Sequence, residues 1–347
     1  MKKRIAGTPE ACVTMRWYEC APGLYEIDEF DCASCFLVVG EEKALLIDTG
    51  VGIGDLKWLV ENRLTDKPYE VVATHNHGDH IGGAGWFDDI WIHPADANWK
   101  GDHTEPTLEF RRDYAALIRR REGKAYEYDP NTDIRPWPKE PAFRAAADGQ
   151  RFELGGRTVT AYHCPGHTPG ELVLVDDKPQ ALLCGDACNC NWLLNGTLAP
   201  NLRGCAQVAL EALQRIAAMQ GDGYDPEKVF NFHHDFRPVE KPLAPNVLPD
   251  LVCCLESLLQ GTARYERVPD PLSPTGGDRT VARWGDVMVS CMNGDLEKAM
   301  GRSQGFVFFR WIWYNASNCS VRAERSVAAA PAPPQWRPGG RRYRRCV

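Results

Sequence analysis

The stretch Thr74-His75-Asn76-His77-Gly78-Asp79-His80-Ile81-Gly82-Gly83 places three imidazoles and one carboxylate within six positions. It directly follows Val71-Val72-Ala73, an apolar and β-branched run that predicts a buried strand. Divalent metal ions bind nitrogen and oxygen ligands of this kind, and a loop that contains a glycine can direct alternate side chains onto two ions. The chain holds only nine histidines in 347 residues, so chance does not account for the cluster. The stretch therefore predicts a metal-binding loop at the end of a strand.

Three further short segments place a residue of metal-ligand type where a predicted strand ends. They are Pro165-Gly166-His167-Thr168-Pro169-Gly170, Leu183-Cys184-Gly185-Asp186 and Phe232-His233-His234-Asp235. A single histidine or aspartate in a turn is ordinary, and none of the three would be convincing alone. Since residues at strand ends can converge at one edge of a sheet, the four segments together favour one shared site.

The remaining pattern alternates short apolar runs with segments of helical periodicity, which predicts an α/β fold. A chain of 347 residues is long enough for one large domain with insertions or for two small domains. Strands are expected at residues 36–39, 44–47, 71–73, 158–162, 172–175, 181–184, 229–232 and 283–292. Helices are expected at residues 54–63, 108–121, 207–219 and 248–260.

The composition changes at two places along the chain, where we expect an insertion within a domain and a domain boundary. Residues 1–293 are predicted to form one domain with an insertion at about 105–141, which we interpret as a lid or a wall of the substrate pocket. Residues 294–347 are predicted to be a basic, disordered tail, because Ala/Pro-rich and Arg-dense segments bury too little apolar surface to fold alone. In a sharper alternative, the aromatic run at 306–314 and the nearby arginines rest on an anionic surface or on an acidic partner face.

The charge and the short length of the apolar runs argue against several classes of function. Residues 301–347 hold nine Arg and one Glu, a net charge of +8. Because the whole chain has a net charge of −7, residues 1–300 have a net charge of −7 − 8 = −15. A body this acidic is not expected to bind nucleic acid, since phosphate contacts need clustered Lys and Arg. No apolar run approaches the roughly 20 residues that span a bilayer, and the basic N-terminal residues lack the apolar stretch of a secretory signal. We therefore expect no membrane span and a cytoplasmic protein.

Fourteen cysteines are scattered over the chain, which favours reduced thiols over a disulfide framework. Cys32-Ala33-Ser34-Cys35 has the spacing of a redox or zinc motif. Cys35 opens an apolar run and no second pair lies nearby, so we interpret both cysteines as buried thiols.

The order His-x-His-x-Asp-His, Pro-Gly-His, Gly-Asp and strand-end His resembles the metallo-β-lactamase superfamily over about residues 17–292. Asp48, in Leu46-Ile47-Asp48-Thr49-Gly50, resembles the carboxylate that braces the metal loop in this family. The resemblance implies an α/β fold of the αββα type, in which two mixed sheets pack face to face with helices outside and the metals lie at one edge.

The resemblance also implies a ligand set for two divalent metal ions. His75, His77 and His167 would hold the first ion, Asp79, His80 and His233 the second, and Asp186 would bridge them. We also assign Asp79 a catalytic role. The turn at the last ligand departs from the family pattern, so His234 stays an alternative to the favoured His233. We expect zinc, with iron and manganese open, because mixed histidine and carboxylate sites accept all three metals.

The implied reaction is hydrolysis of an ester, thioester or lactone by a metal-bound hydroxide. Asp186 stands where zinc β-lactamases of the cysteine-ligand class have cysteine, so the chain resembles the glyoxalase II and lactonase branches. Alternatives are an iron-dependent oxidoreductase like the persulfide dioxygenases, a β-lactam hydrolase and a non-catalytic binding protein. Persulfide dioxygenases use a single iron, whereas this chain has a complete set of ligands for a second ion, which disfavours the oxidoreductase. A small-molecule substrate is expected, but the sequence determines neither its identity nor the oligomeric state.

Overall fold

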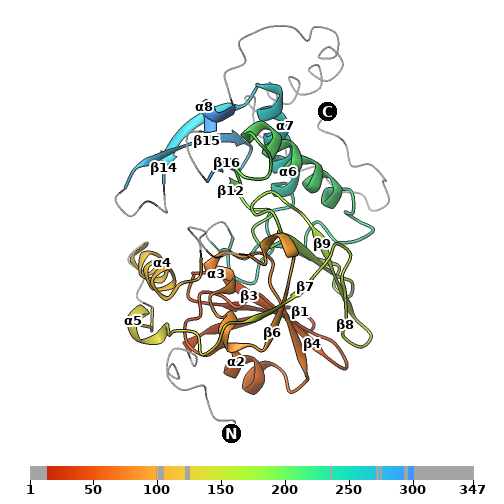
Figure 1. Cartoon of the computed structure of the whole chain (residues 1–347). Coiled ribbons are helices and arrows are strands. Elements are labelled where there is room, and N and C mark those ends of the chain that lie inside the picture. Colours follow the sequence, from red (N-terminus) through yellow and green to blue (C-terminus); the bar gives the residue numbers. More distant parts are fainter. Residues whose placement is uncertain are drawn as a thin grey trace. The chain divides into compact units, whose positions relative to one another are not determined.

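The computed structural model describes residues 14–98, 100, 105–121, 126–234, 237–270, 273, 276–292 and 296–300 (Figure 1). By its internal contacts the chain divides into a unit that ends at Met300 and a second unit, Gly301–Val347. The expectations for the tail, apart from residues 296–300, lie outside the described residues. Leu296 and Met300 of α8 (Leu296–Met300) are buried in the core of the first unit, so its compact part continues past residue 293.

The first half of the chain forms a seven-stranded sheet whose strands are neighbours in chain order. The strands β1 to β4 are antiparallel, and β5, β6 and β7 continue parallel to β4. The strands β3 and β4 are buried on both faces, which explains why they read as continuous apolar runs. The strands are β1 (Arg16–Ala21), β2 (Leu24–Asp28), β3 (Ser34–Val39), β4 (Ala44–Ile47), β5 (Tyr69–Val72), β6 (Asp89–Ile92) and β7 (Ala142–Ala145).

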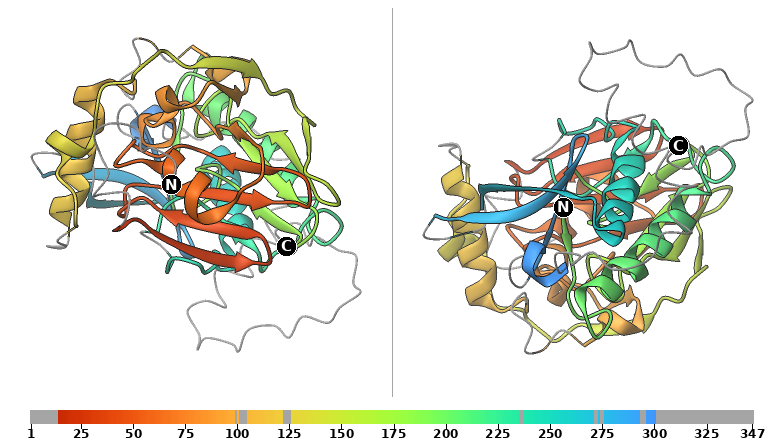
Figure 2. Two further views of the ribbon diagram at one scale, coloured as in Figure 1. Left: turned by 90° about the horizontal axis from the view of Figure 1, so that it is seen from below. Right: turned by 90° about the horizontal axis from the view of Figure 1, so that it is seen from above.

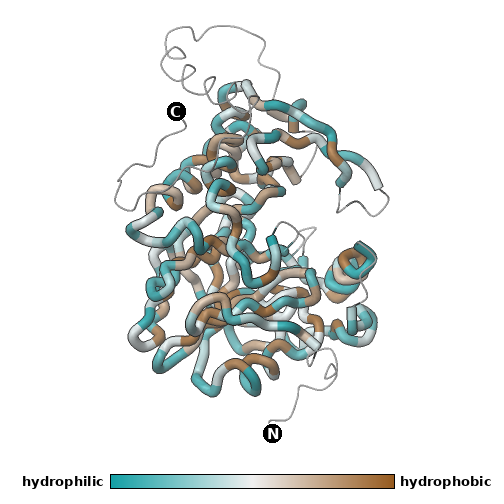
Figure 3. The backbone as a smooth tube through the Cα atoms, turned by 180° about the vertical axis from the view of Figure 1, so that it is seen from behind, coloured by the Kyte–Doolittle hydropathy of each residue, from teal (hydrophilic) through white to brown (hydrophobic). Residues whose placement is uncertain are grey.

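A second sheet of five strands packs against the first. Its strand order is β13-β11-β10-β9-β8. Phe36 and Ile47 of the first sheet share one core cluster with Leu174 and Phe230 of the second. Figure 3 shows apolar stretches, in brown, along the interior strands and hydrophilic residues at the outer turns. The strands are β8 (Arg151–Glu153), β9 (Thr158–His163), β10 (Leu172–Asp176), β11 (Ala181–Leu183) and β13 (Val229–Phe230).

Helices cover the outer face of each sheet. Trp58, Ala115 and Ile118, from α2 and α4, pack with Leu37 and Leu46 on the first sheet. The helices α6 (Leu202–Ala217) and α7 (Val247–Gln260) pack against each other and on the second sheet (Figure 2). This order of helix, sheet, sheet and helix confirms the predicted αββα sandwich. The shorter elements are α2 (Leu56–Leu59), the π-helix η1 (Val60–Leu64), α3 (Gly78–Ile81), η2 (Ala84–Trp86), η3 (Pro94–Asp96), α4 (Leu108–Arg120) and α5 (Pro130–Asp133).

A third sheet of four strands was not expected from the sequence. Its strand order is β12-β16-β15-β14, with β12 (Asn191–Leu194), β14 (Arg264–Pro269), β15 (Asp278–Trp284) and β16 (Val287–Cys291). The single strand predicted at 283–292 is wrong. Gly285, with φ of 54°, and Asp286 turn the chain there, so that β15 and β16 pair as a hairpin.

Candidate metal centre

The ligand-type residues of the sequence motifs follow strands that end at one edge of the sandwich. In the second sheet β10 is antiparallel to β9 and β11, and β13 is parallel to β11. The strands β9, β11 and β13 therefore run in the same direction, and His167, Asp186 and His233 follow their carboxyl ends. In the first sheet β5 leads directly to the metal loop that begins at His75. The fold thus brings together side chains from segments far apart in the chain.

The side chains of these segments form three overlapping groups that could hold a metal ion. In each group the candidate ligand atoms lie within 4.8 Å of one another. The His167 Nε2 atom lies 3.0 Å from His77 Nδ1, and His80 Nε2 lies 3.3 Å from His233 Nε2. The groups are His75, His77 and His167; His75, His80 and Asp186; and Asp79, His80 and His233. All seven residues predicted as ligands therefore lie in one cluster.

The Asp186 carboxylate lies between the two histidine groups. Its Oδ2 atom is 3.4 Å from His167 Nε2 and 3.3 Å from His233 Nε2, and its Oδ1 atom is 3.7 Å from His80 Nε2. This is the position that a bridging ligand requires.

Two buried atoms of the cluster support a metal centre. Within the described part of the chain, His75 Nε2 and Asp186 Oδ1 have no hydrogen-bond partner. Buried polar atoms are normally satisfied, so an unpaired nitrogen and an unpaired carboxylate oxygen that face the same point fit a bound cation. Burial, followed by the charge of the neighbouring imidazoles, lowers the pKa of His75 well below its usual range. The ring is therefore neutral, which is the form that binds metal.

Asp48 braces the metal loop, as the sequence led us to expect. Its Oδ1 atom accepts a hydrogen bond from the Thr74 backbone N–H at 2.6 Å. Its Oδ2 atom accepts from Thr74 Oγ1 at 2.8 Å and from His80 Nδ1 at 2.7 Å. Because His80 donates through Nδ1, its Nε2 atom is left facing the cluster.

Sequence reasoning missed two buried carboxylates that support the ligands. Glu171 Oε1 accepts from the Asp186 backbone N–H at 3.0 Å and lies 3.6 Å from His75 Nδ1. Asp96 accepts from Thr168 Oγ1 and from the Gly170 backbone N–H, each at 2.6 Å, and so holds the turn that carries His167. Asp96 lies just after β6, so the strand-end rule would have found it, and Glu171 is the carboxylate directly before the apolar strand β10.

The two histidines after β13 face different surroundings. His233 lies in the cluster, whereas His234 contacts a separate group of polar residues. The Nδ1 atom of His234 lies 3.2 Å from Asp31 Oδ1, and its Nε2 atom is hydrogen-bonded to Ser34 Oγ and lies 3.4 Å from Glu26 Oε1. Adjacent residues of an extended chain point to opposite sides, so only one of the two can reach the cluster.

His233→Ala is therefore expected to lower the metal content, because it removes a nitrogen that faces Asp79 and Asp186. His234→Ala is expected to lower the free energy of unfolding and to leave the metal content close to that of the wild type. Elemental analysis of both purified variants, beside denaturant unfolding, tests the assignment. Loss of metal in the His234 variant alone would show that His234 is the ligand.

The buried pair of Glu26 and His234 predicts how stability changes with pH. Burial would lower the pKa of His234, but hydrogen bonds with Asp31 and Glu26 raise it from 6.5 to about 9. A raised pKa in the folded state contributes stability that is fully present below pH 6.5 and is lost as the pH rises through about 9. The free energy of unfolding should therefore fall across this alkaline range. His234→Gln should flatten that fall in urea titrations, and an unchanged slope would contradict the prediction.

The same network predicts that the free energy of unfolding also falls at acidic pH. Burial would raise the pKa of Glu26, but hydrogen bonds with His234 and Arg237 and the charges of both lower it from 4.5 to about 2. A lowered pKa contributes stability that is present above pH 4.5 and is lost as the pH falls toward about 2.

The predicted insertion contributes directly to the surroundings of the cluster. Arg111 Nη1 and Trp137 Nε1 both donate to the carbonyl oxygen of Gly82, at 3.0 and 2.7 Å. Gly82 ends the metal loop, so the insertion braces that loop. From the same helix, α4, the Tyr114 hydroxyl donates to the Cys32 carbonyl oxygen at 3.2 Å.

The cysteine pair Cys32 and Cys35 lies in the apolar core of the first sheet. Both thiols are free and buried, and burial raises the pKa of each well above its usual range. A thiol in such surroundings is a poor nucleophile and metal ligand, which agrees with the interpretation as buried thiols.

A family model described as "Metallo-beta-lactamase superfamily" matches residues 31–189. The human "Acyl-coenzyme A thioesterase MBLAC2" is 30% identical over 172 residues, which cover 44% of this chain and 57% of the human protein. The "Atrochrysone carboxyl ACP thioesterase" of Aspergillus fumigatus is 26% identical over 225 residues, which cover 63% of this chain and 44% of that protein. The chain spans about half the length of the curated relatives it matches.

Among solved structures, a beta-lactamase domain protein from Burkholderia ambifaria aligns with 73% of this chain and 78% of its own. The identity is 18% and the TM-score is 0.47. Among the described residues, no helix is long and apolar enough to cross a membrane.

Proposed function

The chain belongs to the metallo-β-lactamase superfamily through residues 31–189, and from this premise we propose that it is a metal-dependent hydrolase of thioesters. The observation that carries the proposal is the convergence of five imidazoles and two carboxylates on one buried point. Relatives named as thioesterases that act on acyl-coenzyme A and on acyl carrier protein support the choice of a thioester over an ester or lactone.

In this proposal His75, His77 and His167 would hold one divalent ion, and Asp79, His80 and His233 would hold the other. Asp186 lies between the two histidine groups and would be a ligand of both ions. When bound, a pair of divalent ions supplies Lewis acidity at the carbonyl oxygen and a nucleophile near neutral pH. We expect zinc, and iron or manganese would fit the same mixed nitrogen and oxygen donors.

The chain's own residues set the geometry and handle the proton. Asp48 accepts a hydrogen bond from His80 Nδ1. The Thr74 hydroxyl is the hydrogen-bond partner of His75 Nδ1 at 3.0 Å, and Glu171 lies 3.6 Å from the same nitrogen. The Nε2 atoms of both rings are thereby left to face the centre. Asp79 Oδ2 lies 3.6 Å from His233 Nε2, and the Asp79 side chain is 12% exposed, so it can be reached from solvent. We assign Asp79 the role of accepting the proton released during hydrolysis.

A substrate panel with metal analysis tests this function. The same acyl group is offered as a coenzyme A thioester and as an oxygen ester, beside a lactone and a β-lactam. We expect cleavage of the thioester, its loss with a chelator and its recovery when divalent metal is added back. Metal-loaded protein that cleaves the lactone or β-lactam but not the thioester would contradict the proposal. One iron per chain with oxygen consumption would replace it by the oxidoreductase alternative.

A further inference from the structure

Two histidines outside the seven candidate ligands, His93 and His163, lie with their imidazole rings stacked. The ring centroids are 3.9 Å apart and the ring planes differ by 6°. His93 directly follows β6 of the first sheet, and His163 is the last residue of β9 in the second. Both residues are partly buried. The stacked pair therefore joins the ends of two strands from different sheets.

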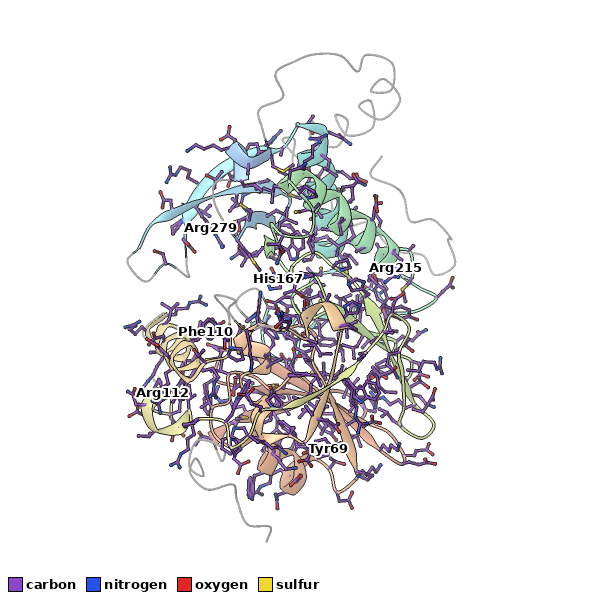
Figure 4. All side chains as sticks on the ribbon, in the orientation of Figure 1. Tyr69, Phe110, Arg112, His167, Arg215 and Arg279 are labelled. Atoms are coloured by element: carbon purple, nitrogen blue, oxygen red, sulfur yellow. The ribbon has the colours of Figure 1, made fainter. Side chains whose placement is uncertain are left out.

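His163 holds the turn that carries His167. Its Nε2 atom lies 2.8 Å from the Pro169 carbonyl oxygen. A carbonyl oxygen can only accept, so this nitrogen carries a proton and donates. The backbone of His163 is itself anchored, because its N–H donates to Asp148 Oδ1 at 2.8 Å and its carbonyl oxygen accepts from Arg215. Figure 4 shows Arg215 at the side of the molecule and His167 nearer its middle, at a similar level.

His93 holds the other side of the same turn through η3. Its Nδ1 atom accepts from the Ala95 backbone N–H at 3.2 Å and so caps η3. The last residue of η3 is Asp96, whose carboxylate accepts from Thr168 and Gly170 in the turn. The packing there is tight, since a Cβ atom at Gly170 would lie 2.6 Å from the Asp96 carboxyl carbon. A shift of η3 would therefore move the turn.

The two rings respond differently to a second proton. A charged His163 keeps its N–H donor for the Pro169 oxygen. A charged His93 has an N–H on both ring nitrogens, so its Nδ1 atom can no longer accept from Ala95 and the cap of η3 is lost. It would also place a second positive charge in a ring stacked 3.9 Å from the first. The stacked pair thus accommodates one additional proton but not two.

The groups around the stacked pair favour the uncharged form of His93. Burial lowers the pKa of His93, the charge of His163 lowers it further, and the Asp148 carboxylate raises it in part. Asp148 also accepts from Arg215 through both carboxylate oxygens, each at 2.9 Å, so its charge is shared with a cation that is already present. The Asp96 carboxylate is engaged by the turn.

We propose that His93 and His163 are positioning residues for His167, and that they hold its turn only while His93 is uncharged. The inference rests on the metal centre of the proposed function. Because the pKa of His93 is lowered from 6.5, the stabilisation is fully present above that pH and is lost as the pH falls below it. Acid should therefore loosen the turn and release the metal ion, in addition to any protonation of the ligands.

The release of metal at two pH values tests this role. Zinc-loaded protein is mixed with an excess of chelator at about pH 8 and about pH 5.5, on either side of the usual histidine pKa. His93→Asn keeps a side-chain acceptor for the Ala95 N–H but cannot be charged. We expect release to accelerate between the two pH values about five- to tenfold less in His93→Asn than in the wild type. Protonation of the ligands cancels in this comparison. Equal acceleration would overturn the proposal.

Three further variants separate positioning by the stacked pair from a merely structural role. His163→Gln keeps a donor for the Pro169 oxygen and removes the repulsion, but His93 can still lose its contact with η3. It should therefore reduce the acceleration less than His93→Asn does, and the double variant should match His93→Asn. Asp148→Asn keeps an acceptor for the His163 N–H and should increase the acceleration, because it removes the carboxylate that favours a charged His93. Variants that change release equally at both pH values would reject the proposal.

Unfolding of the metal-free protein separates the stacked pair from the proposed function. Between about pH 8 and about pH 5.5, the equilibrium constant of unfolding in urea should rise about five- to tenfold more in the wild type than in His93→Asn. If the protein binds no metal but this difference appears, the proposed function fails and the proton-sensitive pair stands. An equal pH dependence in both proteins would reject the pair whatever the metal content.

Discussion

Asp186→Ala is expected to lose metal and to reduce thioester turnover by about a thousandfold or more. The expected size follows from the several kcal/mol that metal ions contribute to the stabilisation of charge in the transition state, at about 1.4 kcal/mol for each tenfold. Among the residues that the structure describes, Asp186 is the one whose side chain approaches His80, His167 and His233 together. Its loss should therefore disturb both metal positions, whereas loss of a peripheral histidine disturbs one.

The backbone at Asp186 is held independently of its carboxylate, so the variant should still fold. The backbone N–H donates to Glu171, and the carbonyl oxygen accepts from Trp192 Nε1 at 3.0 Å. Elemental analysis and steady-state kinetics give the result, with circular dichroism to confirm the fold and Asp222→Ala, at an exposed position, as the control. Full metal content and activity in Asp186→Ala would remove the bridging carboxylate from the proposed centre.

Glu26→Gln is expected to lower the free energy of unfolding by about 3–5 kcal/mol, because it leaves the buried Arg237 guanidinium without its charged partner. The two atoms Arg237 Nη2 and Glu26 Oε1 are 2.6 Å apart, and both side chains are almost fully buried. Arg237 also donates through Nε to Asn231 Oδ1 at 2.7 Å and through Nη2 to the Asn231 carbonyl oxygen at 2.6 Å. The pair thus ties β2 to the segment that carries His233.

A second buried ion pair provides the matched control. Arg157 and Asp176 form a pair with both side chains almost fully buried, and none of the hydrogen bonds of Arg157 involves a predicted ligand or the segment that carries His233. We expect Asp176→Asn to lower the free energy of unfolding by a similar amount and to leave the metal content unchanged. Glu26→Gln should lower both. Urea unfolding and elemental analysis of the two variants decide the matter, and equal metal content in both would show that the Glu26 pair acts on stability alone.

The types of the ligand residues and their order along the chain could be predicted from the sequence. The imidazoles and the carboxylate of the metal loop are close together in the sequence, so they can be recognised as a metal-binding motif without knowledge of long-range contacts. The other segments were recognisable because each follows an apolar run, and the αββα sandwich followed from the resemblance that these motifs carry. The helices α4 and α7 were predicted to within one or two residues, because their apolar periodicity is regular.

Only the tertiary structure shows which residues support the candidate ligands. Glu171 and Asp96 are single carboxylates whose importance comes from burial beside Asp186 and Thr168, and burial depends on how the two sheets pack. The same holds for the choice of His233 over His234, because backbone direction at one residue determines which ring faces the cluster. The spacing of residues within one loop indicates which side chains could bind metal. The burial and the hydrogen bonds of those side chains depend on contacts between distant segments.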